Sequence, residues 1–95
     1  MGTYLVSYDL SKPHRGYEEL ETYLRSNPDW ARVLQSVWFV QTQLTARALA
    51  EEVARRVDSD DHFVVTPLFT PVGQYSVWYN LDPQVDAWLK RPNAA

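Results

Sequence analysis

Two segments of this chain are apolar on both sides of an extended backbone, and this feature limits the folds that the chain can adopt. Residues 3–9 (TYLVSYD) and 37–41 (VWFVQ) are rich in β-branched and aromatic residues, with no charge before Asp9. Successive side chains of a strand point to opposite faces, so each segment presents apolar groups to both faces of a sheet. Such strands are typical of the middle of a sheet.

The rest of the chain alternates between helical and extended patterns. Four further elements are predicted: helices over residues 17–27 and 46–57, and strands over residues 31–34 and 62–67. Thr45 is a typical N-cap, and Gln35 and Ser36 favour a turn or bulge. The order strand, helix, strand, strand, helix, strand is the split βαβ arrangement of an α+β, ferredoxin-like fold.

An additional strand and a short helix are expected after this core. Residues 74–80 (QYSVWYN) form a fifth candidate strand, and Asp82 followed by Pro83 is typical of a helix start. We therefore expect a single domain over residues 1–95, with its core at about 3–68 and a C-terminal strand and helix at about 74–91.

The predicted topology leaves one face of the sheet bare. Right-handed crossovers place both main helices on the same face, yet the two central strands are apolar on both. An exposed apolar sheet is unfavourable in water, and a second copy of the same sheet is the simplest cover. The sequence therefore predicts a homodimer packed sheet to sheet.

Composition excludes several classes of function. The 95 residues carry 12 acidic and 9 basic side chains, a net charge of −3, which does not favour coating nucleic acid by charge alone. The absence of cysteine excludes disulfides, a thiol nucleophile and Cys-ligated metal sites. No apolar run approaches the roughly 20 residues of a membrane span, and the N-terminus lacks the pattern of a signal peptide. We expect a cytoplasmic protein without membrane contact.

Three segments resemble a known family when they are taken in order. They are YLVSYDL (residues 4–10), RVLQSVWFV (residues 32–40) and DDHFVVTPL (residues 60–68). Together they resemble CRISPR-associated protein 2, the smaller protein of the spacer-acquisition pair. The Lys12-Pro13 loop and the segment WLK (residues 88–90) are similar to the stand-alone, SinR-like branch of that superfamily.

The resemblance implies a ferredoxin-like homodimer whose fifth strand extends to the partner's sheet. It also implies that the Asp closing the first strand, here Asp9, meets its symmetry mate and holds a divalent metal, Mg²⁺ or Mn²⁺. Some members of the family are metal-dependent nucleases, and others act without that activity.

Asp9 is accordingly the candidate catalytic and metal-binding residue. One carboxylate holds Mg²⁺ poorly, because the ion prefers octahedral oxygen coordination and retains several waters. Two Asp9 side chains across a two-fold axis supply two ligands and leave waters for phosphodiester hydrolysis. The alternative is that Asp9 accepts backbone N–H groups of the loop at residues 10–16.

The only compact basic cluster follows directly. Lys12, His14 and Arg15 are candidate nucleic-acid-binding residues that meet phosphate oxygens, with His14 as a proton shuttle. The alternative is an exposed polar loop. His62 is more typical of a structural histidine. The acidic run at residues 58–61 lacks the Gly and the distal Glu of an EF-hand loop, and helix termination accounts for it better.

Three functions remain open from the sequence. The first is a metal-dependent endonuclease that acts on RNA or DNA through Asp9. The second is a non-catalytic dimeric scaffold or adaptor for a protein or nucleic-acid partner. The third is a toxin-like ribonuclease.

Overall fold

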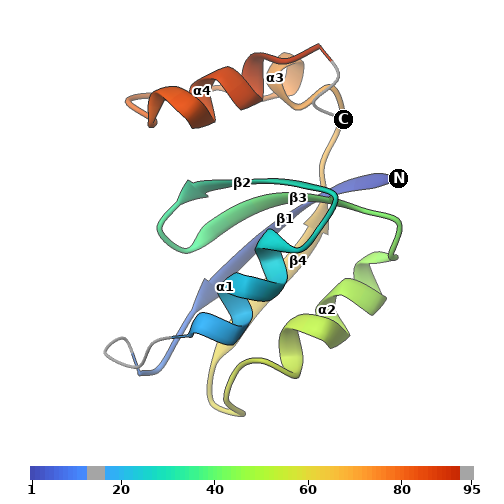
Figure 1. The fold of residues 1–95 in the computed structure, drawn as a ribbon, viewed down its shortest axis with the longest axis vertical. Helices are drawn as coiled ribbons and strands as arrows, with labels where there is room; N and C mark the ends of the chain where they lie inside the picture. The colour runs from blue at the N-terminus through green and yellow to red at the C-terminus, as the bar shows by residue number, and fades with distance from the viewer. Residues whose placement is uncertain (13–16, 93–95) are drawn as a thin grey trace.

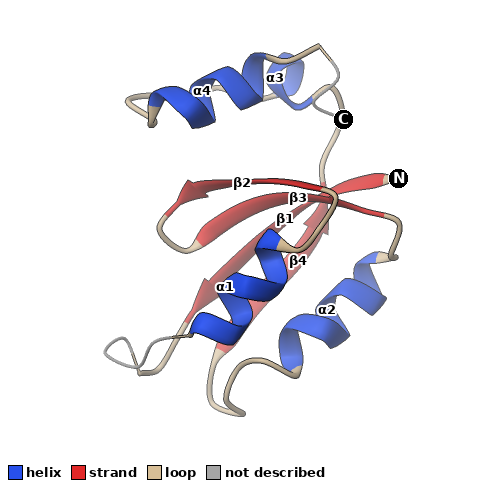
Figure 2. Ribbon diagram, in the orientation of Figure 1, coloured by secondary structure: helices blue, strands red, loops and turns tan. Residues whose placement is uncertain are grey.

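A computed structural model describes residues 1–12 and 17–92 and shows an antiparallel sheet between layers of helix (Figure 1). The strand order is β2-β3-β1-β4. The strands are β1 (Gly2–Asp9), β2 (Asp29–Leu34), β3 (Val37–Thr42) and β4 (His62–Pro67). The helices are α1 (Glu18–Arg25), α2 (Ala46–Ala54), α3 (Val72–Tyr75) and α4 (Pro83–Lys90) (Figure 2).

The two strands that the sequence predicts to be central lie in the middle of the sheet. β1 pairs with β3 on one side and with β4 on the other. This order is compatible with the predicted ferredoxin-like fold. The turn expected at Gln35 and Ser36 is confirmed, because these residues separate β2 from β3. The pairing register is irregular between Arg32 and Leu34, just before the turn.

One face of the sheet is covered by α1 and α2, which lie on the same side of it in Figure 1. Both helices are amphipathic, and their buried side chains are Leu20, Leu24, Leu49 and Val53. These side chains form one core with Val6, Trp38 and Val40, which are fully buried in the central strands. The indole Nε1 of Trp38 donates to the Tyr8 hydroxyl at 2.9 Å, so its polar end is satisfied inside the core.

The second face is covered in part by the chain's own C-terminal segment. α3 and α4 lie on the side of the sheet opposite to α1 and α2 (Figure 1). Val72, Trp88 and Leu89 form a second core with Ala31 of β2 and Phe39 of β3. The second copy that the sequence predicts as the simplest cover is therefore not needed for the β2–β3 half of this face.

The part of the second face around the end of β1 and the start of β4 is left uncovered, whereas Thr3 is buried and Leu5 packs against the second core further back along β1. Residues paired across an antiparallel ladder share a face, and Ser7 and Asp9 pair with Val64 and His62. Asp9, His62 and Val64 are exposed, Val64 to 53%. We call these four residues the open half-face.

Asp29 ties the C-terminal helix to the edge of the sheet. Its Oδ1 accepts hydrogen bonds from the Trp30 backbone N–H at 2.9 Å and from the Trp88 Nε1 at 3.0 Å, and its Oδ2 pairs with Arg91. Partial burial raises the pKa of Asp29, but the bonds from Trp88 and Arg91 outweigh it, and the net shift is downward. A charged carboxylate at the start of β2 thus holds the C-terminal end of α4 through Trp88 and Arg91.

The expected fifth strand is not formed. Within residues 74–80, the first two belong to α3 and the following four pair with no strand of the described sheet. Trp78 instead donates its Nε1 to Asp86 of α4 at 2.7 Å and packs with the second core. Trp78 therefore packs against a helix of the same chain, whereas Val77 and Tyr79 on either side of it are 100% and 85% exposed.

Both predicted N-caps are confirmed. The Thr45 hydroxyl accepts from the Ala48 backbone N–H at 3.1 Å, and the Asp82 carboxylate accepts from the Gln84 backbone N–H at 2.8 Å. Pro83 follows as the first residue of α4. Within the described residues, no helix combines the length and the apolarity needed to cross a bilayer.

The contact between α3 and α4 leads to a stability prediction. A Cβ on Gly73 would lie 2.1 Å from the backbone oxygen of Leu89, so Gly73→Ala must force the two helices apart. We expect a loss of about 1–3 kcal/mol in the free energy of unfolding, measured by urea denaturation. Gly2→Ala is the matched control, because a Cβ there meets only the movable Tyr4 ring. Equal stability of the two variants would contradict the close packing of α3 on α4.

Candidate functional site

Asp9 lies exposed at the end of β1, on the open half-face. Its partner across the ladder is His62, the first residue of β4. Within residues 1–12 and 17–92, no side chain forms a hydrogen bond or ion pair with the Asp9 carboxylate. The carboxylate is therefore available to a ligand, and an imidazole lies on the adjacent strand.

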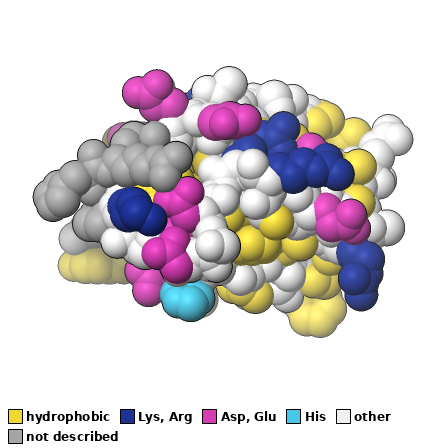
Figure 3. Space-filling model, turned by 90° about the horizontal axis from the view of Figure 1, so that it is seen from below, with side chains coloured by type: hydrophobic (Ala, Val, Ile, Leu, Met, Phe, Trp, Pro, Cys, Tyr) yellow, Lys and Arg dark blue, Asp and Glu magenta, His cyan; other side chains and the backbone are white. Residues whose placement is uncertain are grey.

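An acidic loop lies next to this end of the sheet. Ligand oxygens of Asp58, Asp60 and Asp61 all lie within 4.8 Å of one another, so this exposed group could hold a metal ion. The Lys12 Nζ lies 3.1 Å from Asp58 and 3.6 Å from Asp60. The ammonium group of Lys12 is thus already the counter-ion of two of these carboxylates. Figure 3 shows acidic side chains gathered around a basic one at this end of the molecule.

Asp61 holds the two loops together. Its Oδ1 accepts from the backbone N–H and the hydroxyl of Ser11, at 2.7 and 2.9 Å, and from the Tyr17 hydroxyl at 3.2 Å. Its Oδ2 accepts from the Asp58 backbone N–H at 2.7 Å. The loop after β1 is therefore capped by Asp61, whereas the sequence offered Asp9 for that role.

These bonds stabilise the charged form of Asp61. Partial loss of hydration acts to raise the pKa of Asp61, but the hydrogen bonds from Ser11, Asp58 and Tyr17 outweigh it and lower the value to about 2. The hydrogen bond to Asp58 is the main reason that the pKa of Lys12 is raised. The loop pair thus behaves as a stable network of charges near neutral pH.

The structure separates the predicted site residues. Asp9 is exposed on the open half-face, while Lys12 points to the acidic loop and is neutralised there. His14 and Arg15 lie outside the described residues. The predicted phosphate-binding cluster is therefore reduced, among the described residues, to one lysine that already has acidic partners.

Two features of this site were not predicted from the sequence to be functional. His62 lies beside Asp9, and the acidic loop reaches Lys12. Both follow from the antiparallel pairing of β1 with β4, which places the end of one strand beside the start of the other. The predicted strand order was the signal that could have found them.

Comparison of the chain with models of known protein families, with curated proteins and with solved structures finds no match. The likeness to CRISPR-associated protein 2 therefore stays a prediction from the sequence motifs.

The low pKa of Asp61 predicts how acid affects stability. With a folded pKa of about 2 and an ordinary value of 3.8, Asp61 contributes fully to stability above pH 3.8 and loses its contribution as the pH falls toward 2. Asp61→Asn should therefore flatten the fall in unfolding free energy over that range, as measured by urea denaturation at each pH. Asp60→Asn, which removes only a contact to Lys12, serves as the control. An unchanged slope in Asp61→Asn would contradict the hydrogen-bond network.

Proposed function

We propose that two copies join through the open half-face and act as a metal-dependent phosphodiesterase on RNA or DNA. In this proposal the two Asp9 carboxylates together hold Mg²⁺ or Mn²⁺. The observation that carries it is the position of Asp9, exposed beside His62 on the open half-face.

The surface around Asp9 supports a homodimer of limited size. Val64 is half exposed at the centre of the open half-face, with Ser7 opposite it on β1. α4 occupies the other half of this face, so a partner can reach only β1, β4 and their flanks. Contact across this area brings each Asp9 near a two-fold axis and removes Val64 from water.

The donor set fits a hydrated divalent cation only in the dimer. A single Asp9 offers too few oxygen ligands for Mg²⁺, whereas two carboxylates and several waters satisfy it. An ion in this position supplies a Lewis acid and an activated water for attack on a phosphodiester. His62, on the strand beside Asp9, carries an imidazole that can accept or donate a proton in this reaction.

A non-catalytic scaffold is the second candidate, and the charge around the site favours it. Three carboxylates lie in the neighbouring loop, and Lys12 is paired with two of them. A phosphate backbone that approaches Asp9 meets this negative field. A homodimer that holds a protein partner through its outer surfaces requires no such approach.

The proposed dimer can be tested by placing a charged side chain at the centre of its interface. Val64→Lys places an ammonium group at the centre of the proposed interface, where burial without a partner is unfavourable. We expect the variant to sediment as a monomer at concentrations where the unaltered chain is a dimer. Leu34→Lys is the matched control, because Leu34 is 56% exposed on β2, the edge strand opposite to β4. A dimer that survives Val64→Lys would remove this interface from consideration.

The catalytic part is tested separately. Purified protein should cleave single-stranded RNA or DNA with Mn²⁺, lose the activity in EDTA, and show only background cleavage as Asp9→Asn. Glu51→Gln, an exposed carboxylate on α2, should keep full activity. A stable dimer with no cleavage in any metal would favour the scaffold, and cleavage retained by Asp9→Asn would place the chemistry elsewhere.

A further inference from the structure

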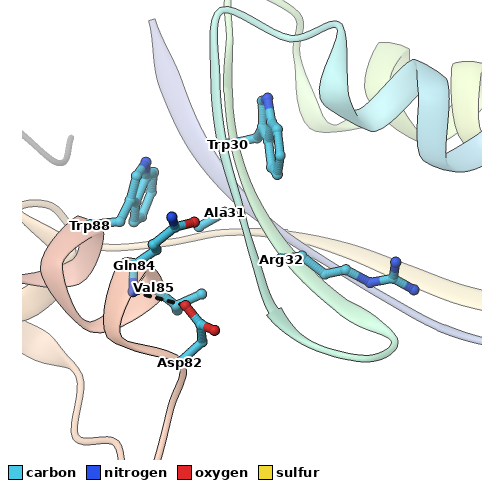
Figure 4. A pocket seen from close by; sticks show the side chains of 7 residues that line it. All are labelled: Trp30, Ala31, Arg32, Asp82, Gln84, Val85 and Trp88. Atoms are coloured by element: carbon cyan, nitrogen blue, oxygen red, sulfur yellow. Dashed lines mark hydrogen bonds between the residues drawn. The ribbon is translucent and has the colours of Figure 1, made fainter.

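A groove runs along the free edge of β2, at the opposite side of the sheet from β4. It has a volume of about 410 Å³ and lies between β2 and α4. Its lining is Trp30, Ala31, Arg32, Asp82, Gln84, Val85 and Trp88, shown in Figure 4. It is distinct from the site at Asp9.

The lining from β2 shows that the groove meets the strand's edge. Trp30 packs against the core beneath the sheet, whereas Ala31 belongs to the core above it. Neighbouring side chains on a strand point to opposite faces, so a hollow that reaches Trp30, Ala31 and Arg32 must wrap around the backbone edge. β2 is the last strand of the described sheet on this side.

Backbone groups on that edge are directed toward the groove. The Trp30 N–H donates to the side chain of Asp29, which places Trp30 among the residues that point away from β3. In an antiparallel ladder these positions alternate, so Arg32 directs its N–H and its C=O to the same free edge. The edge therefore offers a donor and acceptors at the spacing of a further strand.

The opposite wall mixes polar and apolar side chains. Gln84 lies beside Trp88 and Ala31, and Val85 lies next to Asp82 (Figure 4). The Asp29 bond to the Trp88 indole holds this helix wall in place. The helix wall of the groove is therefore fixed in place, and it offers polar and apolar side chains close together.

We propose that this groove binds an extended peptide segment of a partner protein, which adds to the sheet beside β2. Main-chain hydrogen bonds to β2 supply affinity in this mode of recognition, and alternate side chains supply specificity. The segment carries an aliphatic or aromatic side chain that packs on Trp88 and Val85, and a polar side chain that pairs with Gln84 or Asp82.

The lining favours a peptide over single-stranded nucleic acid. Trp88 is only 9% exposed, and Trp30 is in contact with the Trp38 ring at 5.5 Å between centroids. Neither indole presents an open face for a base to stack on. Asp82 and the nearby Asp29 repel a phosphate backbone, and Arg32 is paired with Glu21 at 3.4 Å.

The test selects peptides from a displayed random library on the full chain and measures the best one by fluorescence anisotropy. Enriched sequences should alternate apolar and polar residues, and the resynthesised peptide should shift the amide resonances of residues 30–32. Arg32→Ala removes the side chain and keeps the N–H, whereas Arg32→Pro also removes the donor, a change that edge strands tolerate. Binding should weaken about tenfold more in Arg32→Pro than in Arg32→Ala.

Each other outcome overturns the proposal. Equal affinity of the two Arg32 variants, with both folded by thermal denaturation, would show that the edge donor is not used. Peptide-induced shifts confined to β4 would place the binding elsewhere. Oligothymidylate that competes for residues 30–32 would show a nucleic-acid site, and the same shifts produced by raising protein concentration without peptide would show a second copy.

Discussion

A sheet with two apolar faces needs two covers, and this constraint organises the whole molecule. α1 and α2 bury one face around Val6 and Trp38. The other face is shared: α4 buries its β2–β3 half around Phe39, and the open half-face at the end of β1 and the start of β4 stays exposed. Because burial of apolar surface is the main favourable contribution to folding, the placement of α4 decides which part of the sheet is left for other contacts.

Asp29 fixes the position of α4 on the sheet. One carboxylate binds the edge of β2 through Trp30 and the last turn of α4 through Trp88 and Arg91. Charged hydrogen bonds of this kind are stronger than neutral ones. The same contact therefore anchors the cover of the second face and holds Trp88, which lines the groove along β2, so both surfaces depend on Asp29.

The candidate site could be predicted only in part. The position of Asp9 at the end of a central strand follows from the apolar pattern of residues 3–9, and the structure places it there, exposed. The partners of Lys12 could not be found locally, because Asp58 and Asp60 are more than forty residues away in the chain. Their approach is a consequence of β1–β4 pairing, and it changes Lys12 from a phosphate ligand into part of an acidic network.

The sequence by itself determined the four strands of the sheet, helices α1, α2 and α4, and both N-caps, because each depends on the local spacing of apolar and capping residues. The conformation of residues 74–80 was decided only by the tertiary structure. An alternating aromatic segment suits a strand and a helix contact equally well. Here Trp78 donates a hydrogen bond to Asp86, which holds it against α4. The extent of the open half-face was decided in the same way, since hydrophobic burial is non-directional and a sequence does not state which apolar surface will cover another.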